Sequence, residues 1–343
     1  MSTGQPLRAR VARLGAVLAA AALLVAGCAV PLPTVEADPP PDGPQPALDE
    51  PRLERVLAAV SDALAAGDET GDVTDFGTRV QGPAMHSRRA EYRLAARTAD
   101  TDEAVEPQVL TTEPQVVAIS NEDEWPKRVL VITTIAEGMN TPLLLGMEQD
   151  DPRGDYHLYA WVRLLPETTT PPMAAPVEGS PDVPPDAEGL VLSPADTLDA
   201  YADLLENDAD SEFADTFAED RFRSLVVEDR EAIAESVEDA GEYTEEYSIR
   251  QFEPVGMQTA DGGAVVIGAL RADHVYERTI DDSELTVAGQ IAAFAGSESI
   301  DVETSLTARY YVTVAFYVPP ADADDTTIQV LGAERVLESV DTE

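Results

Sequence analysis

The segments YHLYAWVRLL at residues 156–165 and RYYVTVAFYV at residues 309–318 decide the fold class. Each is a long run of aromatic and β-branched residues, which favour pleated strands, and each ends at a proline, Pro166 or Pro319. Glu137–Asn140 has the composition of a hairpin turn between two earlier runs. We expect strands near 114–120, 128–136, 142–149, 156–165, 244–254, 263–280, 301–318 and 326–338.

Helical patterns precede the strands in both halves of the chain. Pro51–Ala66 carries apolar residues on one face, follows a possible cap at Asp49 or Glu50, and is expected to end at Gly67. In the second half, Ser193 is a predicted N-cap with Pro194 in the first helical position. Three further helices are expected, at about Pro83–Arg97, around Phe213 and Phe217, and at about Asp229–Ala240.

Two proline-rich stretches divide the chain. Residues 28–48 are predicted to be a tether with polyproline II character, which would span up to about 60 Å at roughly 3.1 Å per residue. Residues 166–192 are predicted to be an interdomain linker. The sequence therefore predicts two α+β domains, at 49–165 and 193–340, with a weak internal duplication that aligns 156–165 with 309–318.

Helices followed by antiparallel strands give an element order that resembles the NTF2-like or cystatin-like superfamily. The resemblance covers roughly 49–165 and 193–340 and rests on the order of elements. It implies two tandem domains, each with N-terminal helices packed on a curved antiparallel sheet, and it implies a pocket in some members. Some members of the superfamily are enzymes that use a His–Asp pair, and many are binding or assembly modules.

The N-terminus has the composition of a signal peptide. Arg8, Arg10 and Arg13 form a positive region without acids, and an apolar run from Leu14 to Val25 follows. The run ends in VAGC at residues 25–28, which resembles the lipobox of bacterial lipoproteins. That resemblance implies cleavage between Gly27 and Cys28 and an acyl group, such as palmitate, on the Cys28 thiol.

Cys28 is the single cysteine of the chain, and lipidation accounts for an unpaired thiol in an exported protein. Two alternatives stay open: an uncleaved transmembrane helix from Leu14 to Pro33, and ordinary secretory cleavage. With its lipobox, proline tether and paired domains, the whole chain resembles uncharacterised lipoproteins of actinobacteria. This resemblance implies a cell-membrane protein that is held by its lipid on the extracytoplasmic face, and it carries no active site.

The charge of the chain restricts its partners. The formal net charge is −44, and removal of residues 1–27 would take away three arginines and no acid, which makes it −47. A phosphate backbone would be repelled, so nucleic acid is excluded as a partner. The acidity has two explanations that stay open, codon bias in a GC-rich genome and adaptation to salt.

No motif predicts catalysis. His86, His157 and His274 are far apart in the sequence and have no ligand-type neighbour at helical spacing, so we expect no metal site and no cofactor. Asp273 and His274 would point to opposite faces of a strand and so cannot act together. Two short motifs fit ordinary structure better than function: the alternating acids of 208–212 fit a solvated connection, and Arg153-Gly154-Asp155 fits a turn.

One local feature stands out against the acidic background. Arg89, Arg93 and Arg97 recur at helical spacing and would share one face. The whole predicted docking stripe is Arg79, Arg88, Arg89, Arg93 and Arg97. It is either a solvated face paired with this protein's own acids or a contact surface for an anionic partner, such as a lipid headgroup, a wall polymer or the acidic second half.

The sequence thus favours a non-enzymatic binding or assembly module at the cell envelope. Its partners would be the membrane, through the lipid on Cys28, and an envelope protein or an anionic ligand. The alternative is a carrier of a small molecule or lipid that uses a pocket in one of the domains.

Overall fold

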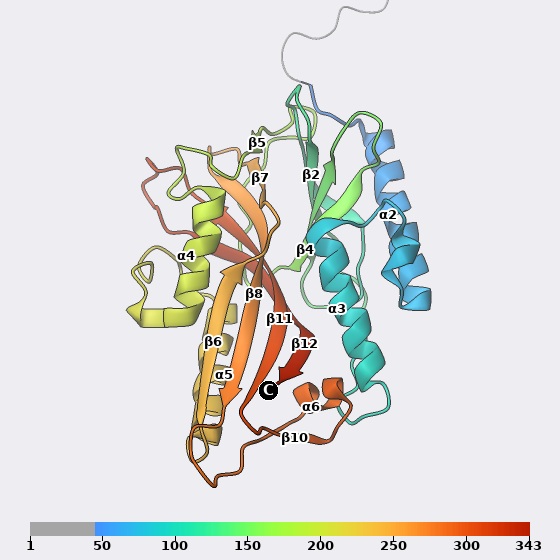
Figure 1. Cartoon of the computed structure of the whole chain (residues 1–343). Helices are drawn as coiled ribbons and strands as arrows, with labels where there is room; N and C mark the ends of the chain where they lie inside the picture. Colours follow the sequence, from blue (N-terminus) through green and yellow to red (C-terminus); the bar gives the residue numbers. More distant parts are fainter. Residues whose placement is uncertain (1–44) are drawn as a thin grey trace, which may run out of the picture. The chain divides into compact units, whose positions relative to one another are not determined.

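The computed structural model describes residues 45–343, and these form one compact unit. This unit is a mixed α+β structure with antiparallel sheets, as the element order predicted (Figure 1). The predicted signal peptide and nearly all of the tether lie outside the described residues. The helices are α2 (Glu50–Thr70), η1 (Val73–Phe76), α3 (Gly82–Thr98), α4 (Pro194–Asn207), η2 (Asp208–Asp210), α5 (Arg221–Val237) and α6 (Gln290–Ala295).

The strands form two main sheets and one small one. The first sheet has the order β1-β2-β3-β4, a simple meander. Its strands are β1 (Pro114–Ile119), β2 (Lys127–Thr133), β3 (Leu143–Gln149) and β4 (His157–Arg163). The second sheet has the order β12-β11-β8-β7-β5, and β6 pairs with β8 beside β7. Its strands are β5 (Asp182–Val183), β6 (Glu242–Ile249), β7 (Val255–Gln258), β8 (Ala264–Glu277), β11 (Ser305–Val318) and β12 (Gln329–Thr342). The small sheet pairs β9 (Thr286–Ala288) with β10 (Ser299–Asp301).

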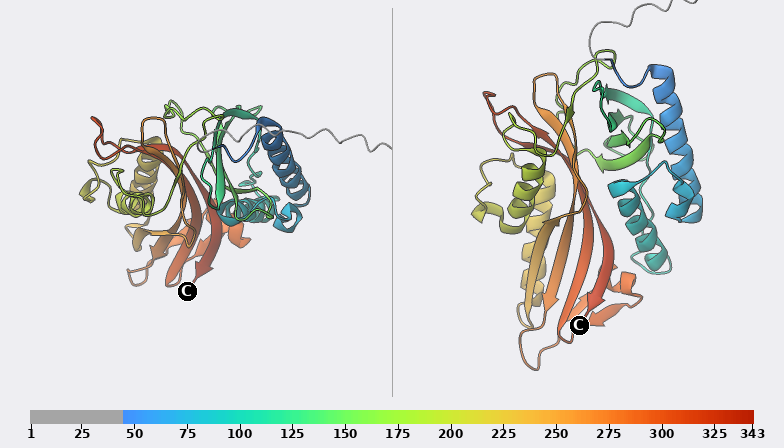
Figure 2. Two further views of the ribbon diagram at one scale, coloured as in Figure 1. Left: turned by 90° about the horizontal axis from the view of Figure 1, so that it is seen from above. Right: turned by 45° about the horizontal axis from the view of Figure 1, so that its top comes forward.

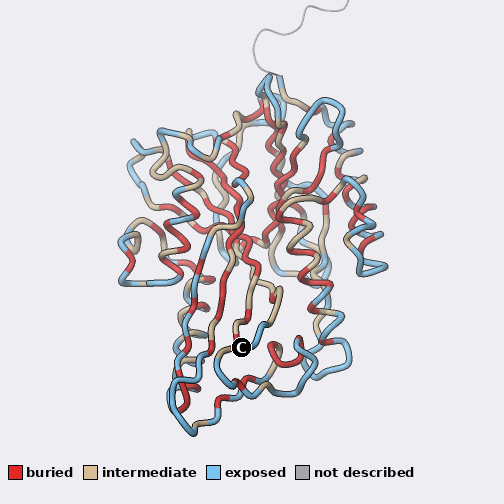
Figure 3. The backbone as a smooth tube through the Cα atoms, viewed as in Figure 1, coloured by how far each residue is buried: buried red, intermediate tan, exposed pale blue. Residues whose placement is uncertain are grey.

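Both faces of the first sheet are buried, which explains why its strands are nearly continuous apolar runs. On β2, Val129 and Val131 belong to the core beneath α2, whereas Leu130 between them belongs to a different core. That second core contains Leu144 of β3, and also Ile267 and Ala315 of the second sheet. The two sheets therefore pack against each other, and buried residues concentrate along these strands (Figure 3).

Helices cover the outer faces of this pair of sheets. α2 lies on the first sheet, and α4 and α5 pack on the second sheet at β6 and β8 (Figures 1 and 2). α3 contacts β4 of the first sheet as well as β11 and β12 of the second. This helix therefore joins the two halves of the chain.

The starts of α2 and α4 agree with the sequence, whereas the end of α2 does not. Asp49 caps α2 by accepting a hydrogen bond from the backbone N–H of Arg52 at 2.9 Å, and Ser193 caps α4 through the N–H of Asp196 at 3.1 Å. The expected stop at Gly67 is wrong, because Gly67 is buried against Phe76 inside α2 and the left-handed cap is Gly71. A glycine is needed at position 67 because a Cβ there would lie 2.2 Å from the ring of Phe76.

Other differences concern the second half. α5 begins at Arg221, capped by Asp220, well before the expected Asp229. Phe213 lies in turns rather than in a helix. The expected correspondence between 156–165 and 309–318 is not reproduced in the sheets, because β4 ends the order of the first sheet while β11 lies between β8 and β12.

The expectation that few contacts cross residues 166–192 is corrected by the structure. Within that segment, β5 pairs with β7, and Ser180 donates its N–H to the carbonyl of Ile119 at 2.8 Å. Next to it, Leu165 donates its N–H to Leu331 at 2.9 Å. The many prolines predicted a linker. In the structure they belong to a segment that packs against both sheets and forms hydrogen bonds with them.

Candidate functional site

A large cavity lies between α2 and β1, and we call it the α2 groove. Its volume is about 820 Å³. The apolar lining comes from the start of α2, the strand β1, the last residues of the expected tether and the 166–192 segment: Pro46, Leu48, Leu53, Leu57, Val117, Ile119, Pro176 and Val177. Among these, Val177 is 79% exposed, at the edge of the groove.

The groove follows from the amphipathic pattern of α2. Leu53, Leu57, Val60 and Leu64 recur on one face and face the first sheet. Val60 is fully buried, whereas Leu53 and Leu57, nearer the N-terminal end, also line the cavity. Two hydrogen bonds hold its walls: Ala47 donates its N–H to Ser120 at 2.7 Å, and Thr112 donates its hydroxyl to the carbonyl of Leu57 at 3.2 Å.

The rim of the groove is acidic. Four exposed carboxylates take part in the lining: Asp49, Glu50, Glu54 and Glu113. Asp49 has a partner in Arg52, whose Nε lies 3.8 Å from Oδ2, but both side chains are exposed and such pairs contribute little. The arrangement is an apolar floor inside a negative rim, which suits an apolar ligand whose polar end is not an anion.

The five arginines of the predicted stripe do not share one surface. Arg88 is 1% exposed and is bound by Asp68, Glu91 and the carbonyl of Gln108. Arg79 pairs with Asp155 at 2.9 Å, at the start of α3 rather than along it. The three remaining arginines lie on one face of α3, with Arg93 and Arg97 exposed and Arg89 half-buried.

One residue of the stripe reaches the second half of the chain. Arg93 donates to the carbonyl of Glu338 on β12 at 3.0 Å. Of the partners that the sequence allowed, this contact favours the chain's own acidic second half.

Beside the stripe, a polar cluster connects α3 with β12 through Gln108 and Arg163. Arg163 of β4 lies 3.6 Å from Oε1 of Glu334 and donates to Oε1 of Gln108 at 2.9 Å. Burial raises the pKa of Glu91 to about 7, against the pull of the Arg88 guanidinium. The sequence alone did not indicate this cluster, because its members come from four separate segments.

His274 lies in a second buried polar cluster, on the face of β8 that α5 covers. Its Nδ1 is hydrogen-bonded to the hydroxyl of Tyr243, and burial lowers its pKa to about 4. The hydroxyl of Tyr243 also donates to Glu245, which accepts from Tyr247 and Arg230 as well. The alternation of Tyr243, Glu245 and Tyr247 along β6 is a signal in the sequence that could have found this cluster.

Asp273 has no part in that cluster, as the strand geometry predicted. It pairs with Arg309, whose Nε lies 3.0 Å from Oδ1, on the opposite face of the sheet. The two neighbouring side chains therefore belong to separate environments.

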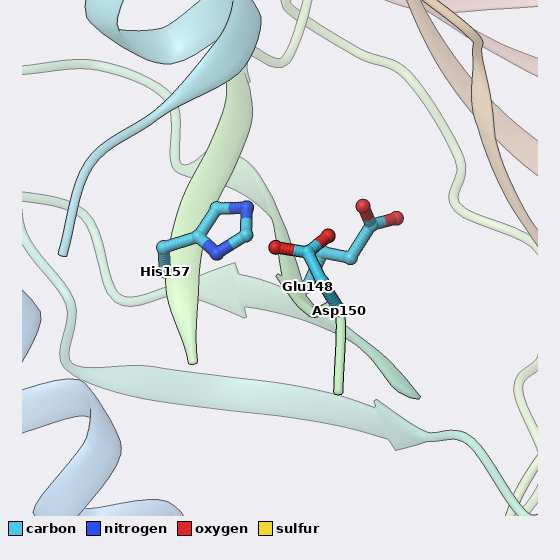
Figure 4. A group of neighbouring side chains, drawn as sticks. All are labelled: Glu148, Asp150 and His157. Atoms are coloured by element: carbon cyan, nitrogen blue, oxygen red, sulfur yellow. The ribbon is translucent and has the colours of Figure 1, made fainter. Parts of the chain in front are cut away.

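Within residues 45–343, one group of side chains could hold a metal ion: Glu148, Asp150 and His157 (Figure 4). Their ligand-type atoms all lie within 4.8 Å of one another. Burial lowers the pKa of His157, so its imidazole is neutral at neutral pH. A search for ligand-type neighbours at helical spacing cannot detect this group, because Glu148 and His157 meet across two neighbouring strands.

The fold and the groove define an α+β protein with a sizeable apolar cavity, and comparison places it in a family. The chain belongs to the family described as a domain of unknown function (DUF8094), which matches residues 44–338. No curated protein and no solved structure matches the chain. Across the described residues, no helix combines the length and apolar character needed to cross a membrane.

Proposed function

We propose that this protein is a non-catalytic binding module of the cell envelope, and that its α2 groove takes an acyl-chain amphiphile with a neutral or cationic head. The observation that carries the proposal is the groove itself. Its volume of about 820 Å³ falls within the range of roughly 300–1,000 Å³ that is typical of small-molecule sites.

The lining selects the chemical class of ligand. Burial of each methylene contributes about 0.8 kcal/mol, so a long chain can gain enough free energy from a floor of leucines, valines and prolines. The carboxylates at the rim would repel a fatty acid or an anionic phospholipid. A neutral head that offers hydroxyl groups, or a cationic head, can instead donate hydrogen bonds to them.

Membrane attachment through Cys28 supports the same role. The lipobox at 25–28 and the tether at 28–48 would hold the unit within about 60 Å of the bilayer, at roughly 3.1 Å per residue. The tether leads directly to the groove, because Pro46 and Leu48 are part of the lining. A lipid that leaves the membrane would therefore have a short path to the site.

The finer NTF2-like assignment is part of the proposal. It is supported by α2 and α3 on the first sheet and by α4 and α5 on the second, which is the order of elements of that superfamily. The groove lies between a helix and a sheet, where its members form their pockets.

The test is to identify what the membrane-purified protein carries. Solvent extraction removes a non-covalently bound amphiphile and leaves the covalent acyl group on the protein. We expect about one equivalent of a neutral or cationic amphiphile, and an intact mass that shows loss of residues 1–27 and added acyl mass.

A pair of variants makes the test specific. Val177→Glu places a fifth acid in the groove at an exposed position, and Leu225→Glu makes the same change at a 41% exposed residue of α5 outside the groove. Val177→Glu should lose the amphiphile, and Leu225→Glu should retain it. Recovery of anionic lipid, or equal recovery from both variants, would contradict the proposal.

A further inference from the structure

The hairpin between β3 and β4 brings a histidine and two carboxylates together. Glu148 and His157 are direct partners in the antiparallel register, so their side chains project from the same face about 4.5–5.5 Å apart at Cβ. Asp150 follows Glu148 by two positions, which returns its side chain to that face. Figure 4 shows the ring of His157 turned toward the carboxylates of Glu148 and Asp150.

One nitrogen of the buried His157 imidazole lacks a hydrogen-bond partner. The residue is 3% exposed, and its Nδ1 makes no hydrogen bond among the described residues. A buried polar atom without a partner costs roughly 1–3 kcal/mol, so such an atom in a native protein calls for an explanation. A cation between this ring and the two carboxylates would be coordinated by one of the ring nitrogens.

The turn that follows β3 holds the third ligand in place. Asp151 accepts hydrogen bonds from the N–H groups of Arg153 and Gly154 at 2.8 and 3.1 Å. Gln149 donates to the carbonyl of Gly154 at 2.7 Å. Asp150 therefore lies in a turn that is stabilised by hydrogen bonds. Because Asp150 is exposed, water can complete the coordination of an ion.

Arg128 leaves the group with a net negative charge. Its Nε donates to Oε2 of Glu148 at 2.9 Å, which fixes that carboxylate and leaves Oε1 for another ligand. Its Nη1 also lies 3.9 Å from Oδ2 of Asp182, so one guanidinium faces three carboxylates and the surroundings stay negative enough to attract a divalent ion. The hydrogen bond from Arg128 is the kind of outer contact that orients a metal ligand.

We propose that Glu148, Asp150 and His157 bind one divalent transition-metal ion of the Zn²⁺ type. One imidazole nitrogen with two carboxylate oxygens suits Zn²⁺, whereas Ca²⁺ and Mg²⁺ prefer oxygen ligands alone. Bonds of about 2.0–2.2 Å in a tetrahedral arrangement place the ligand atoms of one ion roughly 3.4 Å apart. The ligand-type atoms of the group lie within 4.8 Å of one another, so the side chains must rotate toward the ion, and the exposed Asp150 is free to do so.

Titration of the full chain with ZnCl₂ tests the site, with excess Mg²⁺ present to occupy the many carboxylates of this acidic protein. We expect one saturable equivalent, and X-ray absorption at the zinc edge should show an imidazole nitrogen among the ligands. Asp150→Asn removes an exposed ligand without disturbing the core. It should weaken binding at least tenfold, because even outer-shell changes cost about 10–100-fold.

Two further variants complete the experiment. Asp123→Asn changes an exposed acid that is not in the group and should bind Zn²⁺ as the wild type does. His157→Gln should remove the nitrogen signal. Equal affinity in Asp150→Asn and Asp123→Asn, or an oxygen-only zinc spectrum for the wild type, would overturn the proposal.

Discussion

Arginines only a few positions apart in α3 have opposite environments. Arg88 is 1% exposed and contacts Asp68 and Glu91, whereas Arg97 is exposed. Helical phase separates them, since Arg89, Arg93 and Arg97 recur every four residues and Arg88 does not. The cluster of arginines was visible in the sequence. Its division into a buried arginine and an exposed face depends on which side of α3 meets the first sheet.

Glu91 makes the stability of the protein depend on pH. Burial raises its pKa from 4.5 to about 7, so the folded protein holds this proton more tightly than the unfolded chain. Its contribution to the free energy of unfolding is therefore greatest below pH 4.5 and is lost as pH rises to about 7. We expect Glu91→Gln to flatten the dependence of the urea midpoint on pH across this window.

The control for this prediction is Glu103→Gln, which changes an exposed carboxylate of the same half. It should leave the pH dependence as in the wild type. If Glu91→Gln and Glu103→Gln give the same curve, Glu91 is not the group that titrates in this range.

At the scale of elements, one close approach joins the sheets. Gly332 of β12 pairs with Leu164, and a Cβ at Gly332 would lie 2.5 Å from the carbonyl oxygen of Arg163. That atom is backbone and cannot rotate away, so a side chain at this position must separate β12 from the end of β4.

Gly332→Ala should therefore lower the free energy of unfolding by about 1–3 kcal/mol, as overpacking in a core does. Gly154→Ala is the matched control, because its Cβ would meet its nearest neighbour at 3.5 Å and the site is exposed. Urea denaturation of the two variants measures the difference. Equal stability would mean that the two sheets separate at this point without cost.

Local signals predicted the elements better than they predicted the assembly. Ser193 with Pro194 located the start of α4, and the apolar runs located β1 to β4 within a few residues. Short elements such as β5 and α6 were missed, because pairing with distant strands and not local pattern creates them. The separation into two domains was predicted from the prolines of 166–192. Composition does not reveal that Leu130 of the first sheet packs in the same core as Ile267 of the second.

The candidate sites were harder to predict for the same reason. The α2 groove is built from residues near 46–57, 112–119 and 176–177, and nothing in any one stretch indicates a cavity. The metal-type group depends on the register that places Glu148 opposite His157, which a search at helical spacing cannot detect. The lipidation of Cys28 rests on a local motif, the lipobox-like VAGC at residues 25–28, and it stays a prediction.

At the scale of the whole molecule, the two sheets share a core. Ala118 and Val162 of the first sheet pack in one cluster with Val265 and Leu331 of the second. Loss of either sheet would expose the apolar face of the other to water, which costs roughly 25 cal/mol for each Å². The compact unit of residues 45–343 is therefore expected to unfold cooperatively.

The chain's two tryptophans allow this to be tested, because Trp125 and Trp161 both lie in the first half. In a Trp125→Phe background, fluorescence reports the first sheet through the buried Trp161, and far-ultraviolet circular dichroism reports the whole chain. Phe316→Ala removes a ring from the core beneath α4, which the first sheet does not contact, and should cost about 3–5 kcal/mol. If the unit is cooperative, this distant change lowers the urea midpoint of Trp161 fluorescence as much as that of circular dichroism. A Trp161 transition that stays in place while the circular dichroism shifts would instead mean two independently stable domains, which is what the prolines of 166–192 first indicated.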